Sequence, residues 1–198
     1  MDIMNSIKET IADFIIDIVE TVVIALSIFA VVYLLAFQPH EVIGKSMDGL
    51  DNFHNGQYIL TDKLTYRFRE PQRGEVIIFK YPLDKNYDYI KRIIGLPGEE
   101  IQLRNNKIYI YNDENPDGFP LNENGYIASN IPTSGRAFLS DEQRITIPKD
   151  SYFVLGDNRT QSSDSRTWGF ISRNDIVGRS LFRYWPPNEI GMVEKAEY

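Results

Sequence analysis

Residues Thr21–Phe37 read TVVIALSIFAVVYLLAF and contain no charged side chain, with Glu20 before them and Gln38 and Pro39 after them. A helix needs roughly 20 predominantly apolar residues to cross a bilayer, and this stretch comes close to that length. It therefore predicts one transmembrane helix. Everything after Gln38 must then fold as a separate globular part.

Two other interpretations of this stretch compete with a membrane span. A cleaved signal peptide would begin with a basic segment, whereas acidic side chains outnumber basic ones before Thr21 and no clear small-x-small cleavage site follows. A buried core helix would carry a polar stripe, but only Ser27 and Tyr33 interrupt the apolar run. We therefore expect the helix to be retained in the bilayer.

Residues 1–20 also carry apolar side chains at helical spacing, with charged residues on the other sides. Such a segment lies at a membrane interface or leads into the span. Its orientation is weakly encoded, because the positive-inside rule counts only Lys8 on one flank against Lys45 on the other. The apolar positions are Met4, Ile7, Ile11, Phe14, Ile15 and Ile18.

After Gln38 the chain changes to short runs rich in Ile, Val, Tyr and Phe, separated by Gly, Pro, Asn and Asp. No segment there holds a long apolar period of 3.6 residues, so the pattern predicts a β domain over residues 38–198. Asn105-Asn106 is typical of a tight hairpin turn. The predicted strands are Tyr58–Asp62, Glu75–Lys80, Asp88–Ile94, Glu100–Leu103, Lys107–Tyr111, Ser151–Leu155 and Ile176–Tyr184.

One part of the β domain has a different composition. Between Asn112 and Asp141 the residues shift to Asn, Asp, Gly, Pro and Ser. This shift is typical of a looped insertion on a compact core, which we place at about residues 104–147. We expect the insertion to vary without touching the chemistry.

Composition and net charge limit the classes of function. The net charge of -7 and the lack of a Lys/Arg cluster argue against nucleic acid as a partner. The absence of cysteine excludes disulfide scaffolds, thiol catalysis and thiolate metal sites. At 198 residues, with 42% apolar and 25% charged residues, the chain suits one membrane segment and one folded domain.

The first candidate for chemistry is Ser46, in residues 44–47 (GKSM) just beyond the predicted membrane helix. Taken alone such a serine is usually incidental, because its hydroxyl is a poor nucleophile unless a neighbouring base removes the proton. The two histidines, His40 and His54, lie in stretches typical of solvated loops. They also lack the pattern of a metal site, so we expect no metal.

Lysine can replace histidine as the base, but only in its neutral form. The pKa of lysine is about 10.4 in water, and burial can lower it by up to about 3 to 5 units. Strand alternation puts Lys91 on one face of Asp88–Ile94 and Arg92 on the other. Arginine cannot act as a base at physiological pH, so Lys91 is the candidate. The competing interpretation is a pair of solvated charges on an edge strand.

A third polar segment, residues 156–169, reads GDNRTQSSDSRTWG and directly follows the apolar run Tyr152–Leu155. Bland turns rarely carry so many hydrogen-bonding side chains, although a structural Asx-rich loop would explain them about equally well. The segment is therefore a candidate part of the same site as Ser46 and Lys91.

These segments, in this order, resemble the bacterial type I signal peptidases, which share a β catalytic core with the self-cleaving Ser-Lys repressors. The resemblance covers most of the chain, from the membrane helix running into residues 37–39 to Trp185-Pro186. It implies a mainly β fold of the signal-peptidase and self-cleaving-repressor type, preceded by one N-terminal transmembrane helix. The blocks between these ends are 44–47 (GKSM), 73–79 (RGEVIIF), 89–99 (YIKRIIGLPGE) and 156–159 (GDNR).

The resemblance also implies roles for the polar residues of these blocks. Ser46 would be the nucleophile and Lys91 the general base, with the Ser162 hydroxyl orienting the lysine. The backbone N–H of Ser46 would form the oxyanion hole, assisted in some members of the family by a serine at the position of Gly44 here. The remaining residues would support the site, with Asp164 and Arg166 as an ion pair and Asp157 and Arg159 around them.

One loop departs from the family pattern. The family usually follows Ser-Met with x-Pro-Thr or a close variant, whereas this chain has Asp48-Gly49-Leu50-Asp51. Matching the next block, His54–Tyr58, leaves about two extra residues in this loop. We therefore expect a changed fit of the substrate beside the nucleophile and an altered or impaired enzyme, while the retained polar residues argue against a complete loss of activity.

The implied function is that of a membrane-bound serine endopeptidase, which removes signal peptides from exported pre-proteins after small residues and needs no metal or organic cofactor. The N-terminus would be cytoplasmic and the catalytic domain extracytoplasmic. The pre-proteins and the lipid bilayer would be its partners, and the enzyme would act as a monomer.

Two other functions remain as alternatives. The first is a membrane-anchored β module that binds exported peptides with impaired or no catalysis. The second, a soluble self-cleaving repressor, is disfavoured because the N-terminal region is a membrane span and not a pair of DNA-binding helices. The aromatic residues Trp168, Phe170 and Trp185 could touch lipid, but we expect all three in the buried core.

Overall fold

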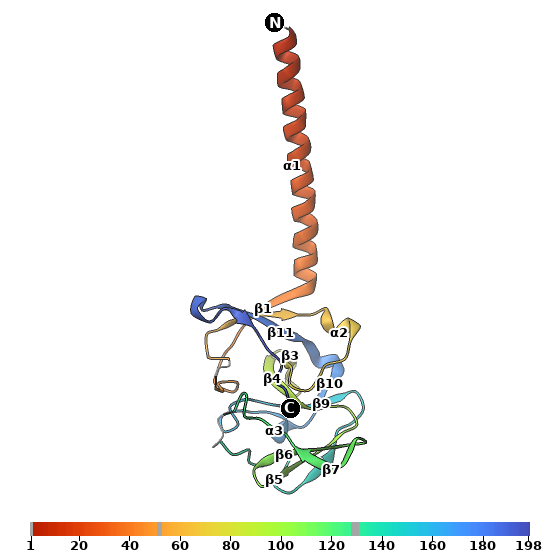
Figure 1. Cartoon of the computed structure of the whole chain (residues 1–198), viewed down its shortest axis with the longest axis vertical. Coiled ribbons are helices and arrows are strands. Elements are labelled where there is room, and N and C mark those ends of the chain that lie inside the picture. The colour runs from red at the N-terminus through yellow and green to blue at the C-terminus, as the bar shows by residue number, and fades with distance from the viewer. Residues whose placement is uncertain (1, 51–52, 128–130) are drawn as a thin grey trace. The chain divides into compact units, whose positions relative to one another are not determined.

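The computed structural model describes residues 2–50, 53–127 and 131–198, with side chains from residue 11 onward. The chain divides into two compact units, Met1–Phe37 and Gln38–Tyr198. The first consists of one long helix, α1 (Asp2–Ala36), and the second is the β domain (Figure 1). The apolar side chains noted at Met4 and Ile7 lie outside the described part.

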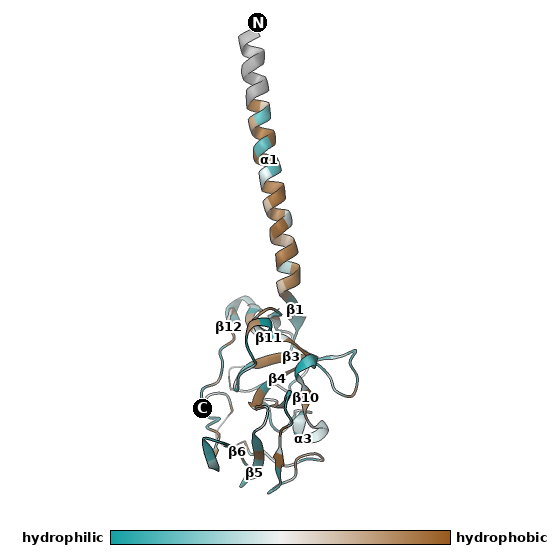
Figure 2. Cartoon of the chain, turned by 90° about the vertical axis from the view of Figure 1, so that its right-hand side faces the viewer, coloured by the Kyte–Doolittle hydropathy of each residue, from teal (hydrophilic) through white to brown (hydrophobic). Residues whose placement is uncertain are grey.

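Helix α1 carries the apolar stretch of the sequence, and its hydropathy rises along its second half (Figure 2). The part Ile11–Ala36 is long and apolar enough to cross a membrane. Its hydroxyl groups bond within the helix: Thr21 Oγ1 donates to the Asp17 carbonyl at 2.8 Å, and Ser27 Oγ to the Val23 carbonyl at 2.7 Å. These bonds reduce the cost of placing the hydroxyls in apolar surroundings.

The larger sheet of the β domain has eight strands, and the pairs from β2 to β10 are antiparallel. Its strands are β1 (Phe37–Glu41), β2 (Tyr58–Asp62), β3 (Val76–Lys80), β4 (Asp88–Gly95), β9 (Ser151–Leu155), β10 (Ile171–Ser172), β11 (Ile176–Trp185) and β12 (Gly191–Met192). Their order is β1-β2-β11-β3-β4-β9-β10, with β12 paired to β11. Strands that are far apart in the chain are therefore neighbours in space.

A second, four-stranded sheet has the order β7-β6-β5-β8. Its strands are β5 (Glu100–Arg104), β6 (Lys107–Asn112), β7 (Asn115–Pro120) and β8 (Arg144–Thr146). Asn105 and Asn106 join β5 to β6 with φ of 50° and 60°. Two positive φ angles in succession define a type I′ turn, whose twist matches that of the flanking strands, so the predicted hairpin is confirmed.

The predicted strands are all present, as β2, β3, β4, β5, β6, β9 and β11. The strands that the sequence did not predict are short or poor in β-forming residues, as in β7, which reads NPDGFP. Such segments become strands because a neighbouring strand supplies the hydrogen-bond partners, which periodicity cannot reveal.

The insertion expected at about residues 104–147 is not all loop. Strands β7 and β8 lie within it and extend the second sheet on both sides. Leu121, Tyr126 and Leu139, which follow β7, are at most 6% exposed. The insertion therefore shares the core of the domain and is held in place by apolar packing.

Four short helices complete the β domain as described, and three apolar clusters fill its interior. One cluster packs Met47 against Val42, Phe53 and Ile59, directly beneath the turn that carries Ser46. The helices are α2 (Thr65–Phe68), α3 (Ser165–Trp168) and the 3₁₀ turns η1 (Arg173–Asp175) and η2 (Pro187–Glu189).

The three aromatic residues expected in the core differ in burial. Trp168 packs on Phe79, with ring centroids 5.9 Å apart, and Phe170 packs against the cluster around Phe153. Trp185 is 50% exposed, so the expectation of burial is wrong for this residue. It is the last residue of β11 and is followed by Pro186 and Pro187.

Candidate active site

Ser46 and Lys91 meet in the β domain although 45 residues separate them in sequence. The buried Met47 fixes the turn that holds Ser46, and β4 carries Lys91. The Lys91 Nζ lies 2.7 Å from the Ser46 Oγ. Ser46 is half-buried and Lys91 is 3% exposed, so a substrate can reach the hydroxyl while water hardly reaches the amine. The 2.7 Å between Nζ and Oγ is the distance expected between a nucleophile and its base.

Burial lowers the pKa of Lys91 from 10.5 to about 8, although the negative charges of Asp164 and Asp157 act in the opposite direction. The Nζ also donates to the carbonyl oxygen of Ile90 at 2.8 Å, which aims the amine at Ser46. A lysine with this pKa is neutral in a sizeable fraction of molecules near pH 7 to 8. The expectation of a buried lysine in this strand is confirmed, and the alternative of solvated charges is wrong.

The loop after β9 approaches the nucleophile turn closely at Gly156. A methyl group on Gly156 would lie 2.3 Å from the Ser46 carbonyl oxygen and 2.2 Å from the Ser162 Oγ. The Asn158 N–H donates to the same Ser46 carbonyl at 3.1 Å. The close backbone approach therefore requires glycine at 156, and it brings the third polar segment of the sequence to the dyad.

Ser162 is 1% exposed beside this contact. Its hydroxyl is close enough to the Asp164 carboxylate to lower the pKa of that group, yet within the described chain its Oγ makes no hydrogen bond of good geometry. A buried hydroxyl without a firm partner is costly and needs an explanation. A rotation toward a neighbouring donor or acceptor in the site would satisfy it.

Asp164 and Arg166 form the ion pair expected from the resemblance. The Arg166 Nε donates to Asp164 Oδ1 at 2.9 Å and its Nη2 to Oδ2 at 2.8 Å, in a two-pronged contact that is fully buried. Burial raises the pKa of Asp164, but the hydrogen bonds and charge of Arg166 outweigh it, so the pKa lies below its usual value. Asp164 also caps α3 by accepting from the Arg166 backbone N–H.

Arg92, on the opposite side of β4 from Lys91, is also buried. Its Nε donates to Asp157 Oδ1 at 2.8 Å, its Nη2 to Oδ2 at 2.5 Å, and its guanidinium lies 4.3 Å from the centre of the Tyr126 ring. The adjacent cations of β4 thus have different surroundings: Arg92 is paired with an acid, whereas Lys91 has lost solvent and contacts a neutral hydroxyl. This difference is what leaves Lys91 able to lose its proton.

Arg159 ties the insertion to the loop of the site. Its Nε donates to the Gly156 carbonyl at 3.1 Å, and its Nη1 donates to Glu123 at 3.0 Å and to Thr133 at 2.6 Å. The Arg166 Nη1 donates to the carbonyl of Ser134 at 3.1 Å. The expectation that the insertion stands apart from the site is therefore wrong.

Sequence reasoning missed Glu123 and Thr133, although a general signal was available. A loop with two arginines beside apolar strands needs acidic partners, because a buried guanidinium is rarely unpaired. Which acid of the insertion serves is decided by the fold alone.

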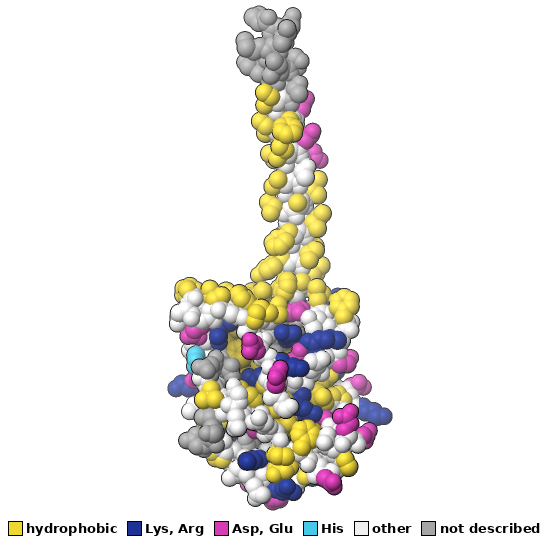
Figure 3. Space-filling model, in the orientation of Figure 1, with side chains coloured by type: hydrophobic (Ala, Val, Ile, Leu, Met, Phe, Trp, Pro, Cys, Tyr) yellow, Lys and Arg dark blue, Asp and Glu magenta, His cyan; other side chains and the backbone are white. Residues whose placement is uncertain are grey.

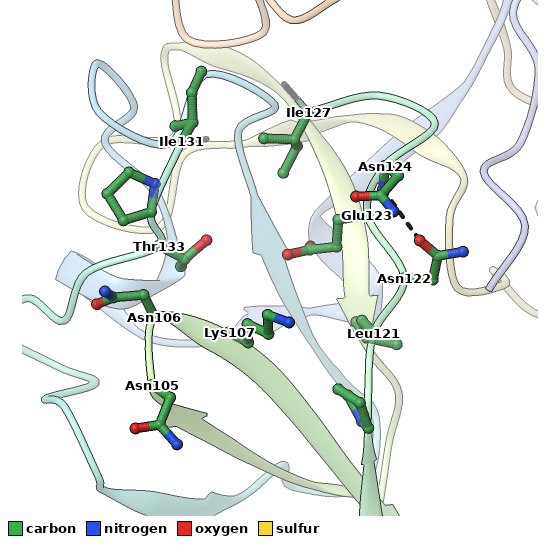
Figure 4. A pocket seen from close by; sticks show the side chains of 12 residues that line it. Asn105, Asn106, Lys107, Leu121, Asn122, Glu123, Asn124, Ile127, Ile131 and Thr133 are labelled. Carbon is green, nitrogen blue, oxygen red and sulfur yellow. Dashed lines mark hydrogen bonds between the residues drawn. The ribbon is translucent and has the colours of Figure 1, made fainter. Parts of the chain in front are cut away.

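A cavity of about 460 Å³ lies beside this contact and includes neither member of the dyad (Figure 4). Figure 4 shows the Glu123 and Thr133 side chains pointing toward one another across it. Both already bind Arg159. This wall of the cavity therefore supports the loop of the site.

The dyad opens into a different cavity, a cleft of about 520 Å³. Apolar side chains from β2, β3, β4 and the segment after β1 line it, together with polar residues that include His40 and Asp88. The His40 ring is half-buried and bonded to Thr61 Oγ1 at 2.8 Å, so the expectation of a solvated loop is wrong for His40. No cluster of three or more metal-ligating side chains occurs in the described residues.

A contact between a histidine and an aspartate side chain joins the two ends of the loop after the nucleophile. His54 Nδ1 lies 2.7 Å from Asp48 Oδ1, and both side chains are at least one-third exposed. Gly44 has φ of +93°, and its N–H donates to Asn55 Oδ1 at 2.7 Å. Gly44 thus offers no hydroxyl and its N–H is already engaged. Asp51, part of the predicted departure from the family, lies outside the described residues.

A buried lysine beside a serine hydroxyl, in an open cleft of a β domain, is the arrangement that a serine hydrolase with a lysine base requires. The sequence model of the signal peptidase family, peptidase S26, matches residues 15–185. The chain therefore belongs to the signal peptidase family, peptidase S26, a family of serine endopeptidases.

Relatives found by sequence agree with this assignment. A probable signal peptidase I-2 of Synechocystis is 38% identical over 68% of this chain, which spans 58% of that relative's length. A signal peptidase I of Leptolyngbya laminosa is 35% identical over 86% of this chain and 78% of its own, and a signal peptidase IB of Staphylococcus aureus is 32% identical over 85% and 88%. A solved signal peptidase I from Enterococcus faecalis is 29% identical, with a TM-score of 0.43 over 56% of this chain and 97% of that one.

Proposed function

We propose that this chain removes signal peptides from exported pre-proteins, with Ser46 as the nucleophile and Lys91 as the general base. The 2.7 Å contact between Lys91 Nζ and Ser46 Oγ, in a cleft open to substrate, carries the proposal. The substrate class comes from the relatives, each of which bears the name signal peptidase I.

The reaction follows from the two protonation states of Lys91. The neutral amine takes the proton of the Ser46 hydroxyl while Oγ attacks the scissile carbonyl carbon. When the carbon–nitrogen bond breaks, the Lys91 ammonium returns that proton to the leaving amine, and an ester to Ser46 remains. Water then attacks the ester, Lys91 takes a proton from the water, and Ser46 regains a proton as the new carboxyl end leaves.

The surrounding polar residues would hold this geometry. Ser162 would orient the Lys91 amine, because its hydroxyl is buried beside Gly156 at the point where the loop meets the dyad. Asp164 and Arg166 would fix the loop that carries Ser162. Asp157 would hold the same loop by accepting from Arg92, and Arg159 would hold it by donating to the Gly156 carbonyl.

The oxyanion of the tetrahedral intermediate would be bound by the backbone N–H of Ser46. Gly44 gives no second donor, because it has no hydroxyl and its N–H is bonded to Asn55. Any second donor would come from another group.

The substrate would bind as an extended strand in the cleft. Strand β1 ends the order of the larger sheet, so among the described residues no further strand pairs with its outer edge. An extended peptide can pair with such an edge, and pockets along it then select side chains. Small pockets beside Ser46 would select small residues before the cut.

The membrane part of the proposal rests on α1 and on the exposed end of the β domain. Residues 21–37 would cross the bilayer, residues 1–20 would be cytoplasmic or interfacial, and residues 38–198 would lie outside as a monomer. Figure 3 shows hydrophobic side chains gathered at the end of the domain where the β11–β12 hairpin lies. Trp185, Ile190 and Met192 are each at least 50% exposed there, which suits contact with lipid.

A membrane-anchored β module that binds exported peptides without cutting them is the second candidate. The departure after Met47 favours it, because the loop from Asp48 borders the nucleophile turn. This candidate predicts binding that survives the loss of Ser46.

Cleavage of a signal-peptide-bearing precursor by the full chain in detergent or lipid tests the proposal. Ser46→Ala and Lys91→Met chains run beside it, with Lys149→Met as an exposed lysine control. We expect a cut after a small residue that disappears in the first two variants and persists in the control. Binding without any cut by the natural chain would overturn the proposal in favour of the binding module.

A further inference from the structure

The cleft that holds the dyad is lined by apolar side chains and by polar ones, among them Glu41, Lys45, Gln161 and Ser163. Val42, Ile59, Ile78 and Ile90 line it near Ser46 and Lys91, whereas the lining also includes His40 and Asp88. His40 is half-buried, and its ring lies 3.5 Å from the Asp88 carboxylate, so a side chain bound in the cleft would meet this pair directly.

The His40 ring is held from several sides. Its Nδ1 lies 2.8 Å from Thr61 Oγ1, and its Nε2 lies 3.5 Å from Asp88 Oδ2 and 3.3 Å from the Gln38 amide nitrogen. Burial lowers the pKa of His40, with Asp88 acting against it and Lys80 with it, so the ring is neutral near pH 7. Asp88 itself is paired with Lys80 at 2.8 Å.

The two walls of the cleft match one another residue by residue. Val42 and Ile90 belong to the same apolar cluster, and two residues earlier in each segment His40 and Asp88 face one another. Side chains on one face of an extended strand recur every second residue, with a rise of about 3.3 Å per residue. If an extended substrate places one side chain beside Val42 and Ile90, the side chain two residues away along the substrate would therefore lie beside His40 and Asp88.

We propose that His40 and Asp88 determine specificity for the fifth substrate residue before the cut, where the cleft accepts a neutral hydrogen-bonding side chain such as Ser, Thr or Asn. This inference rests on the proposed cleavage at Ser46. Substrate residues are counted from the cut toward the substrate's N-terminus. If the first of them lies beside Gly44, the third lies beside Val42 and Ile90, and the fifth lies beside His40 and Asp88.

The charges around His40 and Asp88 decide which substrate side chains fit. An apolar side chain would remove water from the imidazole and the carboxylate without replacing its hydrogen bonds, which costs binding free energy. A lysine or arginine would gain little, because Lys80 already neutralises Asp88. A hydroxyl or amide can donate to one partner and accept from the other.

The test compares three precursors that differ only at the fifth residue before the cut, which is Ser, Asn or Leu. The full chain in detergent should cut the Ser and Asn precursors with a kcat/KM about 3- to 10-fold above that of the Leu precursor. The difference should lie in KM more than in kcat, because this contact is made equally before and during reaction.

Variants assign the preference to its residues. His40→Leu should abolish or reverse the preference, and the nearly isosteric Asp88→Asn should reduce it if His40→Leu folds poorly. His54→Leu is the matched control, since this histidine does not line the cleft, and it should keep the preference. No preference in the natural chain, or a preference unchanged in both His40→Leu and Asp88→Asn, would overturn the inference.

Binding separates this inference from the proposed function. If none of the three precursors is cut, the proposed function fails, and the same peptides are then titrated against the full Ser46→Ala chain by fluorescence anisotropy. Tighter binding of the Ser and Asn peptides than of the Leu peptide would support the inference, and equal binding would overturn it.

Discussion

At the residue scale, the Lys91 side chain is solvated in the unfolded chain and almost fully buried in the folded one. Burial lowers its pKa to about 8, so at pH 7 most folded molecules must hold an ammonium group out of water. The negative charges of Asp164 and Asp157 lessen the cost. The same burial that makes Lys91 a useful base therefore reduces the stability of the fold.

Replacing this lysine should stabilise the protein. Lys91→Met removes the buried charge, and we expect the free energy of unfolding at pH 7 to rise by about 1–3 kcal/mol. Because the unfolded chain binds the proton more tightly, the natural protein gains stability as pH rises from about 8 to 10.5, and the difference from the variant should shrink there. Denaturant unfolding at several pH values measures this, with Lys149→Met expected to change little.

The rate of cleavage should follow the same proton. Only neutral Lys91 accepts the proton of Ser46, so kcat/KM should rise with pH through about 8 and level off above it. A pH–rate profile of the full chain on one precursor measures the midpoint. A rate that is flat between pH 6 and 9 would show that deprotonation of Lys91 does not limit the reaction.

Gly156 is the residue with the least space near the dyad. In Gly156→Ala the methyl group would lie 2.3 Å from the Ser46 carbonyl oxygen, so the turn or the loop must move. We expect cleavage to fall by about 100-fold, since small displacements of catalytic groups are costly, and stability to fall by about 1–3 kcal/mol. Gly191→Ala, whose methyl group meets no atom within 4 Å, is the control for both measurements.

At the scale of elements, the loop after β9 is held by elements on both sides of it. It contacts the nucleophile turn through Asn158 and reaches β4 through Asp157 and Arg92. The insertion holds it through Glu123 and Arg159. The order of the site therefore depends on strands that carry no member of the dyad.

The pair between Glu123 and Arg159 should be sensitive to truncation. Glu123→Ala leaves the fully buried Arg159 without its acid, which we expect to cost about 3–5 kcal/mol of stability and to lower kcat about 10-fold by loosening the loop. Glu100→Ala is the matched control. The Glu100–Arg144 pair joins β5 to β8 and is partly exposed, so it should contribute at most about 1 kcal/mol to stability. Equal effects of the two variants would contradict this role of the insertion.

At the scale of the whole molecule, the chain consists of one apolar helix and one β domain with its own core. A shared bilayer would raise the effective concentration of a membrane-bound substrate at the site. The helix would then contribute to the reaction without supplying a catalytic group.

Removing residues 1–37 tests whether the helix acts only by bringing the domain and a membrane-bound substrate together. We expect the remaining domain to fold and to cut a short soluble peptide at a rate within a few-fold of the full chain. Cleavage of a precursor embedded in vesicles should fall by about 10²- to 10⁴-fold, the range that linkage provides. An equal loss on both substrates would mean that the helix supports the fold of the domain instead.

The sequence by itself determined the apolar helix, seven strands of the β domain and the candidates Ser46 and Lys91. These features depend on periodicity, turn residues and the chemistry that a serine nucleophile needs, all of which are local. The strand alternation around Lys91 even separated it correctly from Arg92.

Only the tertiary structure decided which groups meet. It placed Lys91 beside Ser46 and Glu123 beside Arg159, contacts across 45 and 36 residues. It also moved His40 from an expected loop into the cleft and left Trp185 exposed. Such outcomes depend on strand order and on burial, which sum contributions from distant segments, so no local pattern contains them.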